Sequence, residues 1–256
     1  MIDSHAHLQD EKFNDIEKII NNAKNANVTK IICASSSIST SKKAVEIANR
    51  FKNVYATIGI HPEEAQEWNG DTLKTLEDLA LNEKVVALGE TGLDYYYEFC
   101  SREKQKESFI SQIKLSNKLK LPLVIHTRNA SGDTMDIIRK YRSYLNNGVV
   151  IHCYSMSLEI LSEILNYGFY ISLGGAITFK NARNLLDIAR AVDLDKLMLE
   201  TDCPYMAPEP FRGEVNEPKN IEYVAKKIAE LKNISFEEVA SKTTNNAIKF
   251  FRLKDK

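Results

Sequence analysis

Short apolar runs alternate with longer amphipathic stretches along the chain. The runs predict buried strands near residues 1–7, 30–36, 53–60, 85–91, 121–127, 148–154, 169–175 and 196–202. Between them, apolar residues recur at helical spacing near residues 11–26, 41–51, 71–82, 102–119, 132–145, 157–167 and 181–193. Several runs, such as Val85-Val86-Ala87-Leu88, are continuously apolar, which is typical of strands covered on both faces in a parallel sheet.

Eight strand–helix repeats in 256 residues predict an α/β fold, a (β/α)8 TIM-type barrel, with a doubly wound sheet as the alternative. Two further helices, over about residues 218–251, are expected to pack on the barrel. No linker or low-complexity stretch interrupts the pattern, so residues 1–256 are expected to form a single domain. The longest irregular segment, Cys203–Asn220, follows the last strand, on the face where barrel active sites form.

Composition narrows the class of protein. Hydrophobic residues make up 43% of the chain and charged residues 27%, as in ordinary globular proteins, and the net charge of −1 gives no electrostatic argument for nucleic acid. No apolar run is long enough to cross a bilayer, and the pattern of a cleavable signal is missing, so no membrane association is expected. The four cysteines lack Cys-x-x-Cys spacing, so a disulfide framework is not expected, and a cytoplasmic location is the simplest.

Four of the five histidines and two acids stand where predicted strands end. They are His5, His7, His126, His152, Glu90 and Asp202. Because side chains alternate faces along a strand, His5 and His7 point the same way and can offer two nitrogens to one ion. Closure of a barrel would bring Asp202, after strand eight, beside this pair. His126 and His152 can then serve a second ion, with Glu90 as the bridge.

This donor set predicts two divalent metal ions. Mixed imidazole and carboxylate ligands suit Zn²⁺, Mn²⁺ or Fe²⁺, and with added waters they accept Mg²⁺. Two such ions activate a water and stabilise the charge that develops on a phosphoryl or carbonyl oxygen, which describes a hydrolase. Any one of the six residues alone is more often structural, and their combination at strand ends carries the prediction.

A series of short motifs resembles the TatD family of metal-dependent deoxyribonucleases, which belongs to the amidohydrolase superfamily. The motifs are Ile2-Asp3-Ser4-His5-Ala6-His7-Leu8, Gly59-Ile60-His61-Pro62, Gly89-Glu90-Thr91-Gly92-Leu93-Asp94-Tyr95, His126-Thr127-Arg128, Ile151-His152-Cys153, Thr178-Phe179-Lys180-Asn181 and Glu200-Thr201-Asp202-Cys203-Pro204. The resemblance covers essentially the whole chain. It implies a (β/α)8 barrel, the same six metal ligands, and 3′-to-5′ exonuclease activity on DNA, with RNA as an alternative substrate. One departure is Glu214, where related sequences commonly carry basic residues before the Asn-x-Pro motif, although Arg212 remains available.

Two further residues are candidates for the reaction, beside Glu90 and Asp202 themselves. Arg128 lies two residues after His126 and can grip a substrate phosphate, with a salt bridge at the barrel rim as the structural alternative. His61 ends the third strand, where it can contact the scissile phosphate, protonate the leaving group, or simply pack at the rim. Asp202 is expected to act as the general base as well as a ligand.

Other polar residues near these strand ends have open roles. Glu200 and Asp3 can either orient a ligand histidine or be buried carboxylates that backbone donors satisfy. Asp94 and the tyrosines at positions 95–97 are candidates for substrate contact or for rim packing. Stacking of an unpaired base on one of these rings would suit a single-stranded end.

The predicted function is a two-metal hydrolase that removes nucleotides from a nucleic-acid 3′ end, without an obligate protein partner. An amide, ester or lactone hydrolase would need the same site. Arg128 and the Lys180–Arg183 segment favour phosphate. A non-catalytic metal-binding scaffold is disfavoured, because it would not require all six ligand positions.

Overall fold

The computed structural model of the protein describes residues 1–97 and 99–254. Within these residues, eight strands alternate with helices along the chain, as the sequence predicts. The chain divides into two compact units, and each is described by itself. We name residues 34–152 the central unit, and residues 1–33 with 153–256 the terminal unit.

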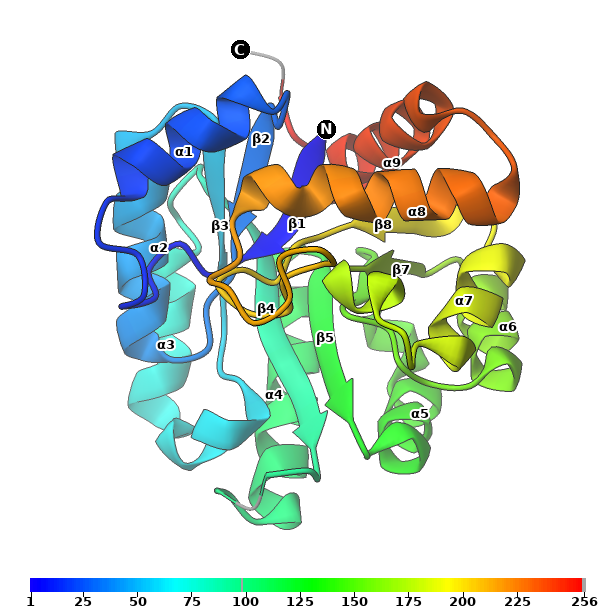
Figure 1. Ribbon diagram of the computed structural model, residues 1–256. Helices are drawn as coiled ribbons and strands as arrows, with labels where there is room; N and C mark the ends of the chain where they lie inside the picture. Colours follow the sequence, from blue (N-terminus) through cyan, green and yellow to red (C-terminus); the bar gives the residue numbers. More distant parts are fainter. Residues whose placement is uncertain (98, 255–256) are drawn as a thin grey trace. The chain divides into compact units, whose positions relative to one another are not determined.

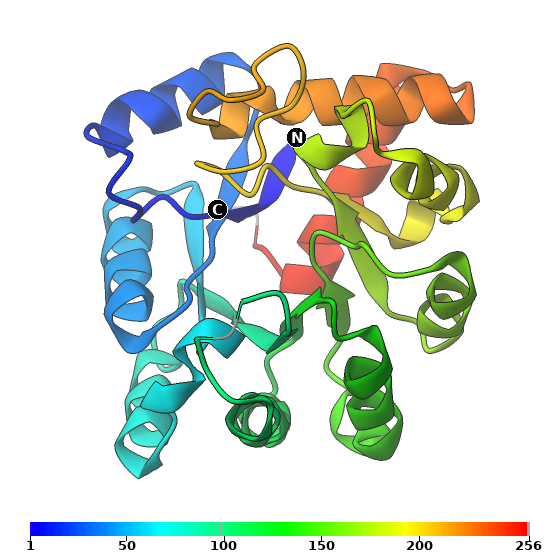
Figure 2. The ribbon, with the colours of Figure 1, turned by 60° about the horizontal axis from the view of Figure 1, so that its bottom comes forward.

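The central unit contains four parallel strands whose order in the sheet follows the chain. They are β3 (Val54–Ile58), β4 (Val85–Asp94), β5 (Leu123–Arg128) and β6 (Val149–Ile151). The helices of this unit are α2 (Ile38–Arg50), α3 (Gly70–Leu79), α4 (Arg102–Leu119) and α5 (Ser131–Lys140), with the short 3-10 helices η1 (Pro62–Glu67) and η2 (Arg142–Tyr144). Figure 2 shows α4 nearly end-on, beside the strands that it covers.

The terminal unit brings together elements from the two ends of the chain. Strand β7 (Tyr170–Leu173) pairs with β8 (Leu197–Leu199), and β1 (Ile2–Ala6) pairs with β2 (Lys30–Cys33), all in parallel. A parallel bridge between Ala6 and Cys203 joins β1 to the segment after β8. The helices are α1 (Ile16–Asn25), α6 (Leu158–Asn166), α7 (Arg183–Ala191), α8 (Ile221–Lys232) and α9 (Phe236–Phe251), with η3 (Gly175–Thr178), η4 (Leu194–Lys196) and η5 (Pro218–Asn220). Helices α8 and α9 pack on each other and on β8 (Figure 1).

Individual caps set the helix starts. The predicted start of α2 near residue 41 is wrong by about a turn, because the Ser37 side chain accepts a hydrogen bond from the N–H of Thr40 and the helix begins at Ile38. The predicted start of α4 at residue 102 is confirmed, because the Ser101 hydroxyl accepts a hydrogen bond from the N–H of Lys104 and the helix begins at Arg102.

Two other helices also begin at a residue other than the predicted one, again because a side chain caps the helix. The sequence predicts a first helix from residue 11, but Asp15 caps α1 and the helix begins at Ile16. The predicted start of α3 at residue 71 moves to Gly70, because Asn69 caps the helix by accepting hydrogen bonds from two backbone N–H groups. A capping side chain competes for the backbone locally, so the hydrophobic period alone does not locate these starts.

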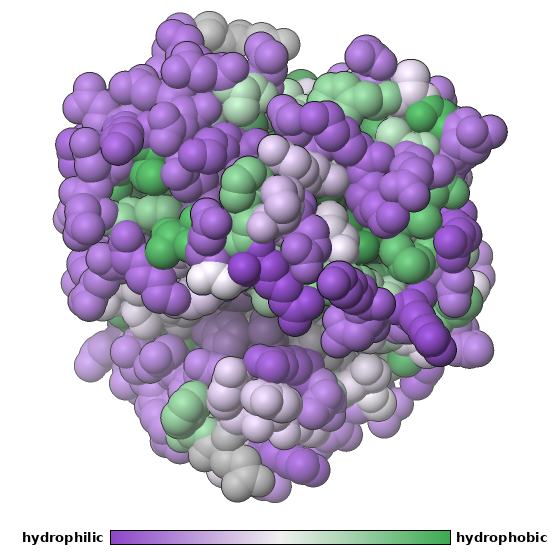
Figure 3. Space-filling model, viewed as in Figure 1, coloured by the Kyte–Doolittle hydropathy of each residue, from purple (hydrophilic) through white to green (hydrophobic). Residues whose placement is uncertain are grey.

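The surface over α1 is almost entirely hydrophilic (Figure 3), as expected for a helix that buries one stripe against a sheet. Ile20 and Ala23 supply the buried positions of that stripe. Within residues 1–97 and 99–254, no helix combines the length and the apolar character that a membrane crossing requires.

Candidate metal centre

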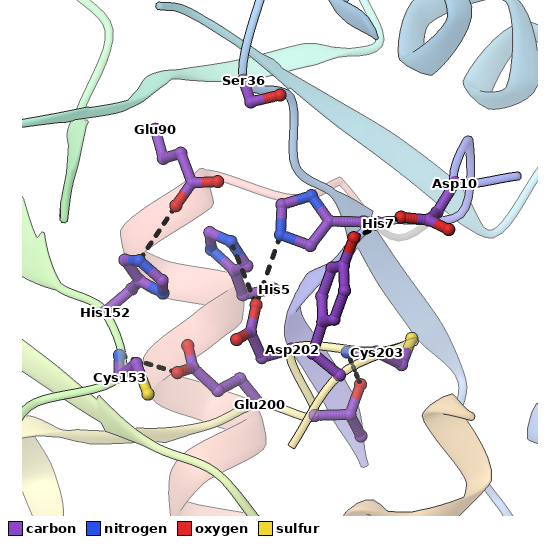
Figure 4. A network of polar contacts seen from close by, with 12 residues as sticks. His5, His7, Asp10, Ser36, Glu90, His152, Cys153, Glu200, Asp202 and Cys203 are labelled. Atoms are coloured by element: carbon purple, nitrogen blue, oxygen red, sulfur yellow. Dashed lines mark hydrogen bonds and ion pairs between the residues drawn. The ribbon is translucent and has the colours of Figure 1, made fainter. Parts of the chain in front are cut away.

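Three side chains at the carboxyl ends of neighbouring strands meet in the central unit. Glu90 lies in β4, His126 lies in β5, and His152 directly follows β6. The Nδ1 atom of His126 is 3.0 Å from the Nε2 atom of His152. The Oε2 atom of Glu90 is 3.0 Å from that His152 nitrogen and 3.7 Å from the His126 nitrogen. We name these residues the central cluster; Figure 4 shows its Glu90–His152 pair.

The spacing of the central cluster fits one metal ion. In a tetrahedral site with bonds of about 2.1 Å, the ligand atoms lie about 3.4 Å apart, which is close to the three distances found here. The side chains of Glu90 and His152 are only 5% and 4% exposed. A carboxylate so deeply buried needs a cation or several hydrogen-bond donors beside it. Donor types, spacing and burial therefore all support the predicted use of a divalent metal.

Asp94, at the end of β4, holds His126 from its other side. Its Oδ2 atom is 2.9 Å from Nε2 of His126, and its Oδ1 atom accepts hydrogen bonds from the N–H groups of Tyr96 and Tyr97. Burial acts to raise the pKa of Asp94, but the hydrogen bonds from His126 and the backbone outweigh it and lower that pKa. The ionised carboxylate orients the ring so that Nδ1 faces Glu90.

This orienting role is not foreseen by the sequence, which suggests only substrate contact or packing for Asp94. A signal was nevertheless present. Glu90 and Asp94 are four residues apart, and side chains at that spacing share a face where a strand runs through both positions.

His61, which follows β3, lies against the central cluster. Its ring centroid is 4.3 Å from that of His126, and one of its nitrogens is within 4.8 Å of donor atoms of Glu90 and His126. The Nδ1 atom accepts a hydrogen bond from the N–H of Glu63 at 3.2 Å, so Nε2 carries the proton in the neutral ring. Burial, aided by His126, lowers the pKa of His61 to about 3. A neutral ring with a proton on Nε2 can donate a hydrogen bond to a substrate oxygen.

The terminal unit has a second group of such side chains. His5 lies in β1, His7 follows it, and Asp202 follows β8. The Oδ1 atom of Asp202 is 3.3 Å from Nε2 of His7 and 3.9 Å from Nε2 of His5, and Figure 4 shows both pairs. These side chains are 1% (His5), 13% (His7) and 17% (Asp202) exposed. We name them the terminal cluster, and their donor types and spacing fit a divalent ion of their own.

Hydrogen bonds between β1 and the segment after β8 position the terminal cluster. The N–H of His7 donates to the carbonyl of Cys203 at 2.7 Å, and the N–H of Asp202 donates to the carbonyl of His5 at 2.9 Å. The Ser4 hydroxyl donates to the carbonyl of Leu199 at 2.8 Å. The predicted placement of Asp202 beside the His5–His7 pair is therefore confirmed.

Two buried carboxylates fix the strand ends of the terminal unit. Asp3 accepts hydrogen bonds from the N–H and the hydroxyl of Thr201, at 2.9 and 2.5 Å, while burial raises the pKa of Asp3 to about 8. Glu200 accepts from the N–H of Cys153 at 2.7 Å (Figure 4) and from the hydroxyl of Ser172 at 2.5 Å. These contacts match the alternative in which backbone and hydroxyl donors satisfy the carboxylates.

Arg128 ends β5, two residues after His126. Its guanidinium carbon lies 3.7 Å from the ring centroid of Tyr96 and 5.0 Å from that of Tyr97. The predicted alternative, a salt bridge at the rim, is not found, since no carboxylate of residues 1–97 or 99–254 pairs with Arg128. An arginine held over an aromatic face keeps its fork of donors for an anion.

Other candidate phosphate contacts lie in the terminal unit. The guanidinium carbon of Arg212 is 4.1 Å from the ring centroid of Phe179. Lys180 and Arg183 are exposed. Asn216, from the Asn-x-Pro motif, is fully buried and donates through its amide to the carbonyls of Thr201 and Tyr205, which ties down the loop after β8.

Comparison with known proteins gives matches over almost the whole chain. It is 40% identical over 254 residues to the uncharacterized metal-dependent hydrolase YabD of Bacillus subtilis, covering 99% of each chain. It is 37% identical over 257 residues to the uncharacterized metal-dependent hydrolase YcfH of Escherichia coli, covering 99% of this chain and 96% of the relative.

Solved structures of TatD proteins are also similar to this chain. The TatD homologue YJJV of Escherichia coli superposes with a TM-score of 0.93 at 28% identity, covering 99% of this chain and 98% of that one. A TatD family hydrolase of Entamoeba histolytica gives a TM-score of 0.88 at 27% identity, with coverage of 98% and 97%. The predicted fold class, a (β/α)8 barrel, is thereby confirmed, and the donor clusters support a metal-dependent hydrolase. The family profile described as TatD related DNase matches residues 2–252, and the chain belongs to that family.

Proposed function

We propose that the chain is a 3′-to-5′ exonuclease that hydrolyses phosphodiester bonds at the 3′ end of DNA, with RNA as an alternative substrate. The observation that carries this proposal is the close-packed donor set of the central cluster, in a chain that the TatD related DNase profile matches from residue 2 to residue 252. Arg128, a cation without a carboxylate partner among the described residues, supports an anionic substrate.

The proposed cofactors are two divalent metal ions, Mg²⁺, Zn²⁺ or Mn²⁺. His5, His7 and Asp202 would hold one ion, and Glu90, His126 and His152 would hold the other. Such a pair supplies a Lewis acid for a phosphoryl oxygen and lowers the pKa of a water.

The protein side chains have distinct tasks in the proposed reaction. Asp202 accepts the proton of the attacking water as general base. Arg128 offers parallel N–H donors to the charge that builds on the phosphoryl oxygens. His61 is neutral at physiological pH because its pKa is lowered, so it donates a hydrogen bond to the phosphate rather than acting as an imidazolium acid.

Digestion of end-labelled oligonucleotides tests the proposal. Single-stranded substrates labelled at the 3′ or the 5′ end are incubated with Mg²⁺, Mn²⁺ or EDTA, using wild type, Glu90→Ala and the control Asp136→Asn. Asp136 is 72% exposed in α5 and, within residues 1–97 and 99–254, pairs only with Arg139, so its substitution should change nothing. Shortening from the 3′ end that needs metal and is lost only in Glu90→Ala is the expected result.

A lack of cleavage in this assay would also be informative. Protein shown to carry two bound ions but unable to shorten any oligonucleotide would overturn the nuclease assignment. Amide, ester and lactone substrates would then be tested, and inactivity on all of them would indicate a metal-binding scaffold.

We place this activity in the cytoplasm. Cys33, Cys100, Cys153 and Cys203 are all free thiols, and free thiols persist in a reducing compartment.

A further inference from the structure

Three large aromatic side chains are exposed directly after β4, in the central unit. Tyr96 is 54% exposed, Tyr97 is 40% exposed and Phe99 is 68% exposed. The rings of Tyr96 and Tyr97 meet edge to face at 4.8 Å, and those of Tyr97 and Phe99 stack at 5.5 Å with an interplanar angle of 18°. We name these three residues the aromatic platform. A contiguous exposed group of rings marks a binding surface more often than a single exposed ring does.

Tyr95, which directly precedes the platform, has contacts that are typical of a structural role. The Tyr95 hydroxyl donates a hydrogen bond to Asp133 at 2.6 Å, and the Arg102 guanidinium covers its ring at 4.2 Å. Tyr95 thus has a partner for its hydroxyl and is half-buried. The platform rings, by contrast, turn large areas to solvent.

The platform is anchored to the central cluster through one carboxylate. The Oδ1 atom of Asp94 accepts hydrogen bonds from the N–H groups of Tyr96 and Tyr97, at 2.8 and 3.2 Å. Its Oδ2 atom is 2.9 Å from Nε2 of His126. The Gln105 side chain holds the backbone of Asp94 in place. It accepts a hydrogen bond from the N–H of Asp94 and donates one to the carbonyl of Asp94, both at 2.9 Å. The rings therefore stand at a fixed place beside the metal-ligand side chains.

Arg128 adds a positive charge to this surface. Its guanidinium lies over Tyr96 at 3.7 Å and within 5.0 Å of the Tyr97 ring centroid. An aromatic face next to an arginine fork matches the two parts of an unpaired nucleotide, a flat base and a phosphate.

We propose that the aromatic platform stacks an unpaired base of a nucleic-acid strand, with Arg128 on an adjoining phosphate. This inference rests on the proposed function, because it names the part of the nucleic-acid substrate that the platform holds.

The first test compares substrates with and without bases. Tyr96→Ala should lower kcat/KM about tenfold on a single-stranded oligonucleotide, mostly through KM, because stacking is worth that much per base. On an otherwise identical oligonucleotide whose three terminal nucleotides are abasic, the variant and wild type should be equal. Tyr96→Phe, which keeps the ring, should behave as wild type on both.

A matched control is available in the same unit. Tyr144, in η2, is 39% exposed and precedes β6, at the opposite end of the strands from the ligand side chains. Tyr144→Ala should leave both substrates unaffected. An equal loss for Tyr96→Ala on normal and abasic substrates would overturn the proposal, and so would no loss on either.

The second test does not require cleavage. A single-stranded oligonucleotide with 2-aminopurine at its 3′ end is titrated with protein in EDTA, and stacking quenches its fluorescence. Quenching by wild type and Tyr144→Ala, absent for Tyr96→Ala, is the expected result. If wild type cuts no phosphodiester yet quenches in this Tyr96-dependent way, the proposed function fails and the platform stands. Cleavage without Tyr96-dependent quenching would overturn the platform proposal and leave the proposed function standing.

Discussion

His126 uses both of its ring nitrogens, and this explains why one aspartate follows the ligand in β4. Its Nδ1 atom faces Glu90 and His152, while Nε2 meets Asp94. A carboxylate behind a ligand histidine fixes the tautomer and the angle of the ring, and raises its basicity. The affinity of the central cluster for metal should therefore depend on a residue that is not itself a ligand.

Asp94→Asn should weaken metal binding about 10- to 100-fold without unfolding the protein, because the neutral amide stabilises the ligand ring less than a carboxylate does. Calorimetric titration of EDTA-stripped protein with Zn²⁺ or Mn²⁺ measures this. Asp133→Asn is the control, since Asp133 pairs with Tyr95 and Lys106 away from the ligands. Wild-type affinity in Asp94→Asn would contradict the orienting role.

Cys33 should resist alkylation in the folded protein. It is fully buried in β2, and burial raises the pKa of its thiol to about 12. A raised pKa means that the fold favours the protonated thiol, so this stabilisation is complete below the unfolded value of about 8.5 and is lost as pH rises towards 12. Iodoacetamide at pH 8, followed by peptide mapping, should leave Cys33 unmodified until guanidinium is added. Equal labelling rates with and without guanidinium would contradict this prediction.

The ligand positions could be predicted from the sequence because they depend on two simple rules. Side chains alternate along a strand, and parallel strands end on one face, so His5, His7 and Asp202 had to meet if β1 lay beside β8. The spacing of Asp94 from Glu90 indicates a shared face, but the orienting role of Asp94 could not be predicted, because that role depends on which ring nitrogen of His126 turns towards it. That choice is a matter of side-chain torsion angles.

At the scale of elements, strands were predictable in place but not always in length. The sequence predicts an end of the fourth strand at residue 91, which is wrong, since β4 continues to Asp94. The two glycines of Gly89-Glu90-Thr91-Gly92 suggest a turn. Pairing with β5 instead keeps the segment extended, with Gly92 opposite His126 and Asp94 opposite Arg128.

Gly92 should be irreplaceable in this pairing. Its φ is +145°, and a Cβ atom there would overlap the carbonyl oxygen of His126. Gly92→Ala should cost roughly 3 kcal/mol or more of unfolding free energy, as severe core overlaps and strained backbones do. Denaturant unfolding followed by circular dichroism measures the loss.

Gly132→Ala is the matched control for that substitution. Gly132 lies in α5, where an added Cβ meets nothing within 4 Å. Alanine in this helix should be neutral or stabilise by up to about 1 kcal/mol. Similar stabilities for the two variants would contradict the close approach of β4 to β5.

For the whole molecule, bound metal should raise thermal stability. A ligand that binds only the folded state stabilises it by about 2.7 kcal/mol at a concentration one hundred times its dissociation constant, which corresponds to a Tm increase of roughly 5–10 °C. Calorimetric scans with Mn²⁺ or Zn²⁺ against EDTA should show the increase, and it should be reduced in His7→Ala. An unchanged Tm in wild type under saturating metal would show that the clusters do not bind ions.

The hydrogen bonds between β1 and the segment after β8 also have a consequence for synthesis of the chain on the ribosome. A ribosome that adds about 5–20 residues each second releases His5 and His7 early, but Asp202 and its hydrogen bonds to β1 follow only about 10–40 seconds later. The donors of the central cluster, by contrast, are complete once His152 has been made. Throughout that interval the edge of β1 that faces β8 has no strand to bind. An unpaired strand edge of this kind can pair with a strand of another chain.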